Sequence, residues 1–150
     1  MAETLGSLCD KLTIVKLKQF HAGDPVRLES LEKQQNQLQE EIDAYVFSGL
    51  RGEIPLARLT FSANKIFKEE GNAVSDISGS IGNAFATLAE VNCKLWHEQE
   101  KVYDFEKVPV SQKDSVVKSL AVLNLRRNKC IDHIDKEFRS VVSNLNPQHT

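Results

Sequence analysis

Residues 73–103 read AVSDISGSIGNAFATLAEVNCKLWHEQEKVY, and this is the stretch that decides the fold. Apolar residues recur in it three and four positions apart, which places them on one face of a helix. These residues are Val74, Ile77, Ile81, Ala84, Leu88, Val91, Leu95 and Val102. The spacing predicts one long helix over the whole stretch. Gly79 and Gly82 leave two options open, a close helix contact or a kink or break near 79–82.

The same analysis of the remaining sequence predicts four more helices. Asp24-Pro25 is typical of a helix start, because aspartate caps the first turn and proline fits the first helical position. Residues 48–55 hold two glycines and a proline and therefore predict a loop. The further helices are expected over 4–21, 25–47, 56–69 (shorter than the others) and 111–143.

Patterns within these helices predict how they assemble. The first helix is apolar on two faces, which is typical of a helix buried between neighbours. The second and the last helix carry apolar residues at heptad spacing, as in coiled coils. No run of alternating β-branched residues is present. The sequence therefore predicts an all-α fold, a single helical bundle of four long helices plus one short helix with helix 1 central. One domain should cover 1–150, with 144–150 as a frayed tail.

Composition limits the classes of function. The chain has 150 residues, 41% of them hydrophobic and 27% charged, which is typical of a globular domain. A net charge of −2 argues against nucleic acid or an anionic membrane as partner. No apolar run approaches the roughly 20 residues of a membrane span. There is no signal-peptide pattern, and Cys9, Cys93 and Cys130 are an odd number of cysteines. We therefore expect a cytoplasmic protein with reduced thiols.

Polar residues inside apolar patterns define a candidate site. Arg127 lies in the apolar seam of the last helix, and a buried guanidinium must be paired because it stays charged. Its candidate partners are Asp10, Glu100, Gln99 and Asn92. The predicted ligand-binding or buried polar set is Asp10, Asn92, Trp96, Gln99, Glu100, Tyr103, Asn124 and Arg127.

Three interpretations of Arg127 remain open from the sequence. The favoured one is an internal polar network that fixes the register of the helices. The second is a cleft that binds a carboxylate or another anion. The third is that the side chain extends along the apolar surface until its charged end reaches water.

Metal and catalytic chemistry are not predicted. Cys93-x3-His97 and Cys130-x2-His133 have spacings that can chelate a metal, but helical geometry points both histidines away from the apolar stripes. There is no glycine-rich phosphate loop, GxSxG or HExxH motif. No catalytic residue, metal or cofactor is therefore expected.

Three segments resemble a bacterial all-helical domain family of unknown function. They are LCDKLTIVKLKQFH at 8–21, LAEVNCKLWHEQEKVY at 88–103 and LNLRRNKCIDHID at 123–135. The resemblance implies that the family's motif residues correspond to ten positions of this chain. These are Asp10, Lys11, Thr13, Ile14, Lys18, Asn92, Leu95, Trp96, Asn124 and Arg127. It also implies that the gene for this protein lies near glycosyltransferase genes in a surface-polysaccharide cluster. The chain departs from the family at Gln99-Glu100, where an acidic pair is usual, and at Tyr103, where a basic residue is usual.

The functional prediction has two forms. The first is a non-catalytic binding or assembly protein that uses its bundle surface or an inter-helix cleft, accessory to surface-polysaccharide biosynthesis. The alternative is an enzyme or small-molecule binder that recognises a carboxylate, phosphate or sugar nucleotide around Arg127. A homo-oligomer through the second or the last helix is expected from their heptad spacing, and a protein partner is compatible with it.

Overall fold

The structure is a computed structural model that describes residues 2–61 and 77–145. No β-strand occurs in these ranges, so the all-α prediction is confirmed. Two single-turn 3-10 segments, η1 and η2, lie between the longer helices. The elements are α1 (Leu5–His21), α2 (Pro25–Leu50), η1 (Leu56–Arg58), α3 (Ile81–Tyr103), η2 (Phe105–Lys107) and α4 (Val110–Leu145). None of the helices in the described part of the chain combines the length and apolar character needed to cross a membrane.

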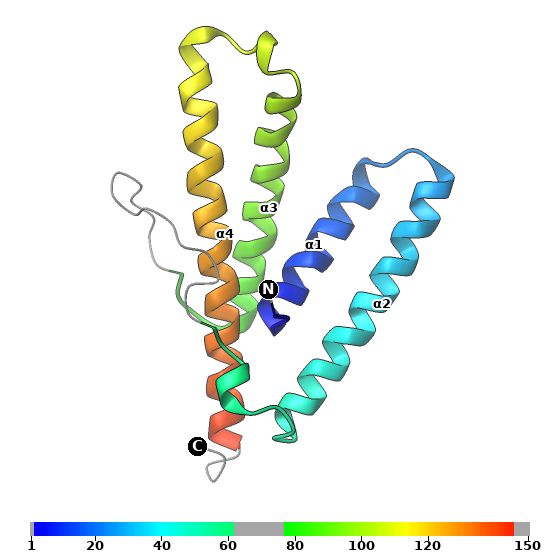
Figure 1. Ribbon diagram of the computed structural model, residues 1–150, viewed down its shortest axis with the longest axis vertical. Coiled ribbons are helices and arrows are strands. Elements are labelled where there is room, and N and C mark those ends of the chain that lie inside the picture. Colours follow the sequence, from blue (N-terminus) through cyan, green and yellow to red (C-terminus); the bar gives the residue numbers. More distant parts are fainter. Residues whose placement is uncertain (1, 62–76, 146–150) are drawn as a thin grey trace.

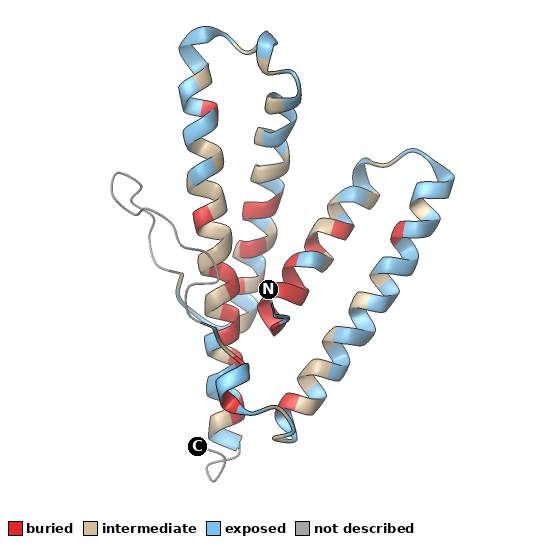
Figure 2. Cartoon of the chain, viewed as in Figure 1, coloured by how far each residue is buried: buried red, intermediate tan, exposed pale blue. Residues whose placement is uncertain are grey.

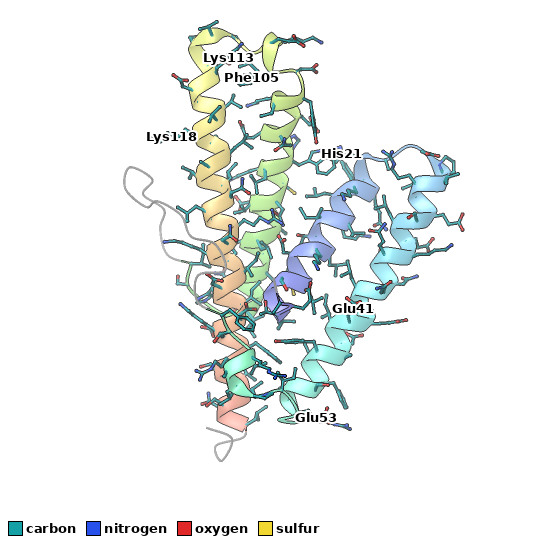
Figure 3. The ribbon with its side chains drawn as sticks, in the orientation of Figure 1. His21, Glu41, Glu53, Phe105, Lys113 and Lys118 are labelled. Carbon is teal, nitrogen blue, oxygen red and sulfur yellow. The ribbon has the colours of Figure 1, made fainter. Side chains whose placement is uncertain are left out.

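The helices are arranged as two hairpins that meet at one end. Figure 1 shows α1 beside α2 and α3 beside α4, with the two pairs diverging away from the start of α1. At the turn of the second hairpin, the Lys113 ammonium lies 4.9 Å from the centre of the Phe105 ring (Figure 3). Among the four longer helices of the described chain, both α1 and α4 contact all three others, whereas α2 contacts mainly α1. The central place that the sequence predicts for helix 1 is therefore shared between α1 and α4.

Local sequence explains where the first two helices begin. The Thr4 hydroxyl accepts the Ser7 N–H at 3.2 Å, and the Ser7 hydroxyl accepts the Thr4 N–H at 2.8 Å. This reciprocal pair satisfies amide groups that the first turn of α1 leaves without partners. The Asp24 carboxylate accepts the Val26 N–H at 3.1 Å, with Pro25 as the first helical residue. Both predicted helix starts are confirmed.

The core lies where the two hairpins meet. Figure 2 shows buried residues concentrated at the start of α1, in the first half of α3 and in the second half of α4. The heptad seams of α2 and α4 pack inside the molecule, although incompletely. In α2 only Leu31 and Gly49 are buried, and in α4 Val117 is 56% exposed at the end away from the core. The buried apolar cluster includes Leu5, Cys9, Leu56, Leu59, Ala84, Leu88, Cys130, Ile131, Ile134, Phe138 and Val142.

The long helix starts later than the sequence predicts. It begins at Ile81 rather than near 73, so the prediction of helix over 77–80 is wrong, and 73–76 lie outside the described residues. Gly79 has φ +96°, a left-handed conformation that favours glycine. Ser80 then caps α3 by accepting the Asn83 N–H at 3.2 Å. Of the two options left open, the structure has a break near 79–82.

The predicted short helix over 56–69 is not matched in the part of that range that the structure describes. Residues 56–58 form only η1, and residues 62–69 lie outside the described residues. A 3-10 turn places residues three apart on one side. That geometry puts Leu56 and Leu59 into the core together, at 8% and 1% exposure.

Two other boundaries also differ from the prediction. The loop expected from residue 48 begins later, because α2 continues to Leu50. Gly49 lies inside α2, where α2 approaches α4 closely. A Cβ at this position would come within 2.7 Å of the Phe138 ring on α4. At the other end of the chain, α4 includes residues 144 and 145 of the predicted frayed tail. Residues 146–150 lie outside the described residues.

Candidate functional site

A polar network of Asp10, Thr13, Asn92 and Arg127 joins α1, α3 and α4. Arg127 donates to both carboxylate oxygens of Asp10, from Nε at 2.8 Å and from Nη2 at 2.5 Å. The Asn92 side-chain amide donates to Asp10 Oδ1 at 3.0 Å and to the Thr13 hydroxyl at 2.7 Å. A two-point contact between guanidinium and carboxylate fixes orientation as well as distance. The network therefore sets how the three helices register.

Burial within this network is uneven. Asp10 and Asn92 are buried, whereas the Arg127 side chain is 33% exposed. The hydrogen bonds that Arg127 donates to Asp10 raise the pKa of Arg127 above its ordinary value. Asn92 Oδ1 is buried without a hydrogen-bond partner among the described residues. The network is thus largely buried, and Arg127 is its most exposed member.

The structure brings together only part of the predicted site. Asp10, Asn92 and Arg127 lie in one network, and Asp10 is the one of the four candidate partners that Arg127 contacts. Asn124 is half-buried one turn before Arg127.

The rest of the predicted set lies elsewhere on α3. Trp96 stacks on the His21 ring of α1, with centroids 4.7 Å apart and planes 9° apart. Gln99, Glu100 and Tyr103 are exposed, because α1 ends before it could cover the last turns of α3. The predicted site residues of α3 therefore do not come together in one site.

Asp135 is a buried carboxylate that the sequence reasoning missed. Its Oδ1 accepts the Gly6 N–H at 2.7 Å, at the first turn of α1, and Asp135 is only 1% exposed. Burial raises the pKa of Asp135 to about 6, and hydrogen bonding by Gly6 and Thr4 only partly offsets this. A signal was available, because Asp135 lies four residues after Ile131 and shares its core face.

Two neighbouring groups respond to the same buried carboxylate. Burial, followed by the charge of Asp135, raises the pKa of the Cys9 thiol to about 12. Burial and the same charge also raise the pKa of the Tyr45 phenol to about 12. Cys9 and Tyr45 are therefore protonated at neutral pH, and the thiol of Cys9 is a packing group rather than a nucleophile.

A groove of about 550 Å³ opens between α1 and α2 on the exposed side of Arg127. Ile14, Val15 and Leu38 form its apolar part. The polar side chains around them come from both helices of the hairpin and from α4, and Lys11 forms an ion pair with Glu3. They are Glu3, Asp10, Lys11, Lys18, Gln34, Gln37, Glu41 and Arg127.

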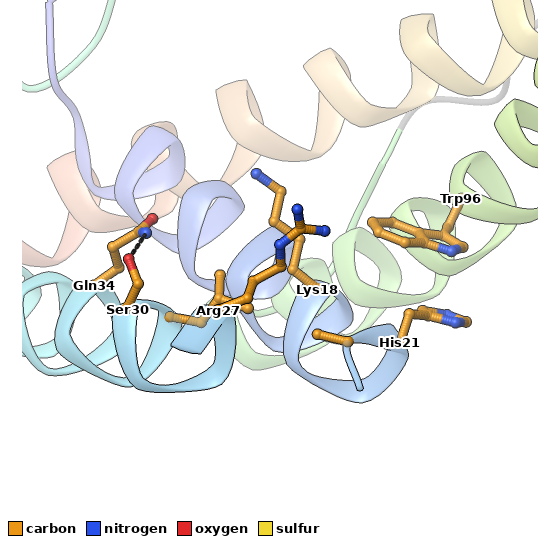
Figure 4. Close-up of a pocket in the computed structure, with 8 residues that line it drawn as sticks. Lys18, His21, Arg27, Ser30, Gln34 and Trp96 are labelled. Carbon is orange, nitrogen blue, oxygen red and sulfur yellow. Dashed lines mark hydrogen bonds between the residues drawn. The ribbon is translucent and has the colours of Figure 1, made fainter. Parts of the chain in front are cut away.

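A second pocket, of about 400 Å³, continues this groove towards the link between α1 and α2 (Figure 4). We call it the basic pocket, because Lys18 and Arg27 line it and no Asp or Glu of the described residues does. Lys18 and Gln34 line both the groove and the basic pocket. The other lining residues are His21, Ala22, Ser30, Leu31 and Trp96.

The two Cys–His pairs face different surroundings. Cys130 is buried in the core, and His133 Nε2 lies 2.9 Å from the Gly79 carbonyl oxygen. Cys93 is exposed and lines a third pocket together with His97, in apolar surroundings. The described residues contain no group of three His, Cys, Asp or Glu side chains placed to hold a metal ion.

Comparison with protein-family models, with curated proteins and with solved structures finds no match to this chain. The resemblance to the bacterial all-helical family therefore stays a prediction, and function is argued from the site alone.

Proposed function

We propose that the protein is a non-catalytic binding protein whose ligand lies in the groove between α1 and α2. One observation carries the proposal: the Asp10 carboxylate is held by Asn92 and Arg127 within the network, while the groove beside it is open and lined by apolar and charged side chains. A concave site with an apolar part and a few convergent polar groups is the usual form of a small-molecule site.

The chemistry of the network favours binding over catalysis. Both oxygens of Asp10 already accept hydrogen bonds, so this carboxylate is not a free general base. The Thr13 hydroxyl donates to the Asp10 carbonyl oxygen at 2.7 Å and accepts from Asn92, so no base activates it. An accessory role in surface-polysaccharide biosynthesis is the wider function that we infer, and the resemblance of the three helical segments supports it.

A second candidate function is the recognition of a carboxylate, phosphate or sugar nucleotide by Arg127, as an enzyme or as a binder. The partial exposure of Arg127 at the wall of the groove favours it. The guanidinium has further N–H donors that are not bonded to Asp10. Charged N–H donors of this kind bind anions. Turnover of a ligand found in the groove would separate the enzyme from the binding protein.

A thermal-shift screen with sugar nucleotides and phosphorylated metabolites tests the proposed function. Gln37→Trp places a large ring at the groove, and Gln39→Trp makes the same change at an exposed position of α2 that does not line it. A groove ligand should raise the Tm of the wild type and of Gln39→Trp but not of Gln37→Trp. A screen without any shift contradicts the proposal, and equal shifts in the two variants place the ligand outside the part of the groove that Gln37 lines.

A further inference from the structure

The basic pocket brings two unpaired cations together. Lys18 comes from the last turn of α1 and Arg27 from the first turn of α2, and Figure 4 shows both side chains pointing into the space beside Trp96. Neither side chain forms an ion pair or hydrogen bond with another described residue. By contrast, Lys11 pairs with Glu3 and Lys33 with Glu29 on the same two helices. Lys18 and Arg27 therefore place two positive charges at a pocket whose lining holds no carboxylate of the described residues.

The position of Arg27 is unfavourable for the helix that carries it. The first turn of a helix has a positive partial charge, so a cation there is repelled, and the first turn of α2 contains no acidic residue. Lys18 has an ordinary explanation, since a cation in the last turn of α1 is favourable. Arg27 has no such favourable position at the start of α2. An anion between the two side chains would be attracted by both cations and by the start of α2.

An aromatic wall stands next to this cationic site. The His21 ring stacks on the Trp96 indole, and the stacking fixes the indole at the side of the pocket. On the opposite side, Gln34 Nε2 lies 3.4 Å from the Ser30 hydroxyl. That contact leaves the Ser30 O–H and the Gln34 carbonyl oxygen to pair with hydroxyl groups of a ligand.

We propose that the basic pocket binds a nucleoside monophosphate. The phosphate lies between Lys18 and Arg27, the base lies against Trp96, and the ribose lies near Ser30 and Gln34. A volume of about 400 Å³ is near the lower end of ligand sites, which suits one nucleotide rather than a dinucleotide. The inference deepens the proposed function and rests on it, because it names the ligand class at one end of the groove.

The experiment is a fluorescence titration, since Trp96 is the only tryptophan of the chain. Adenosine monophosphate is the probe, and adenosine, ribose 5-phosphate and inorganic phosphate are its parts, all measured at one ionic strength. Adenosine monophosphate should change the tryptophan emission and bind at least about tenfold more tightly than each part. Arg27→Gln and Lys18→Gln should each weaken its binding by roughly ten- to a hundredfold, the loss expected for one charge-assisted hydrogen bond.

Lys33→Gln is the matched control, because it removes the same charge from an exposed position of α2 outside the pocket. It should leave the affinity for adenosine monophosphate unchanged. Circular dichroism of each variant shows that it is folded, and calorimetry of Trp96→Ala reports the contribution of the indole without needing its emission.

Several results would overturn the inference. They are no saturation by adenosine monophosphate, equal losses in Arg27→Gln and Lys33→Gln, or equal affinity for ribose 5-phosphate. A screened ligand whose thermal shift is lost in Gln37→Trp and kept in Arg27→Gln and Lys18→Gln overturns the basic pocket but leaves the groove. The absence of any ligand for either site removes the proposed function as well.

Discussion

Asp10 accepts three hydrogen bonds from side chains of two other helices. The loss of either partner side chain would therefore leave this buried carboxylate with fewer hydrogen bonds. Such a group is stabilised only while its partners are in place, because taking a charge out of water is costly. From the sequence, Asp10 was one of four candidate partners of Arg127, and it was a candidate for a physical reason. A charged residue within an apolar seam has few ways to be satisfied, and Asp10 was the acidic residue on a second apolar face.

Arg127→Ala should destabilise the protein by about 2–4 kcal/mol in urea titrations. Removal of one partner of a buried pair typically costs about 3–5 kcal/mol, and the exposed part of Arg127 lets water replace it in part. Arg127→Met combined with Asp10→Leu should be better tolerated than either change alone, because no unpaired charge then stays buried. An urea midpoint of Arg127→Ala equal to that of the wild type would show that the network does not support the fold.

Asp135 should make stability depend on pH. Its pKa is raised from an ordinary 3.8 to about 6 in the folded state, so between these values the folded chain holds a proton that the unfolded chain has lost. The contribution of Asp135 to stability is therefore greatest below about pH 4, falls as the pH rises to about 6, and stays lower above it. The raised pKa of this carboxyl corresponds to a decrease of at most about 3 kcal/mol in the free energy of unfolding.

Asp135→Asn should remove this dependence, because an amide oxygen can still accept the Gly6 N–H and does not titrate. We expect the variant to gain stability relative to the wild type at pH 7 and to match it near pH 4, measured by urea titration at each pH. Asp114→Asn, at an exposed position of the same helix, should keep the wild-type profile. An unchanged profile in Asp135→Asn would refute the assignment.

At the scale of the elements, α1 and α4 approach each other closely at Gly6. A Cβ at Gly6 would lie 2.4 Å from the carbonyl oxygen of Ile131 and 2.9 Å from the Asp135 carboxylate. A helix usually gains about 1 kcal/mol when glycine becomes alanine. Here the clash with the backbone of a packed helix should outweigh that gain.

Gly6→Ala should therefore destabilise the protein, by about 1–3 kcal/mol in urea titrations. Gly23→Ala is the matched control in the link before α2, where a Cβ would meet nothing within 4 Å. It should be neutral or stabilising by up to about 1 kcal/mol, because alanine restricts the unfolded chain. Equal effects of the two changes would mean that α1 is not seated against α4 through Gly6.

Elements were predictable where one cause decided them. The start of α2 follows from Asp24-Pro25 alone, and the apolar faces of α1 follow from spacing. The start of α3 was not predictable in this way, because the apolar spacing continues through Val74 and Ile77. Gly79 takes a left-handed backbone conformation, which the spacing of apolar residues does not report. Gly49 was assigned to a loop, although its small size serves the contact of α2 with Phe138.

At the scale of the whole molecule, the site depends on the angle between the hairpins. Because the hairpins diverge, α1 ends beside Trp96, and the last turns of α3 stay exposed (Figure 1). Periodicity within a helix predicts which face is buried, but not where a neighbouring helix stops covering it. Hence Asp10, Asn92 and Arg127 were recognisable from the sequence. The meeting of Lys18 with Arg27, from two helices, was not.

The hydrogen bond between Gly6 and Asp135 joins residues 129 positions apart, and the pair of Asp10 with Arg127 spans 117 positions. During synthesis the ribosome releases α1 first, whereas its partners on α4 emerge only after most of the described chain has been made. Until then the apolar side chains of α1 have no complete core to enter, and α2 alone covers only part of them. The nascent chain therefore keeps apolar side chains of α1 exposed to water, and the arrival of α4 ends this exposure.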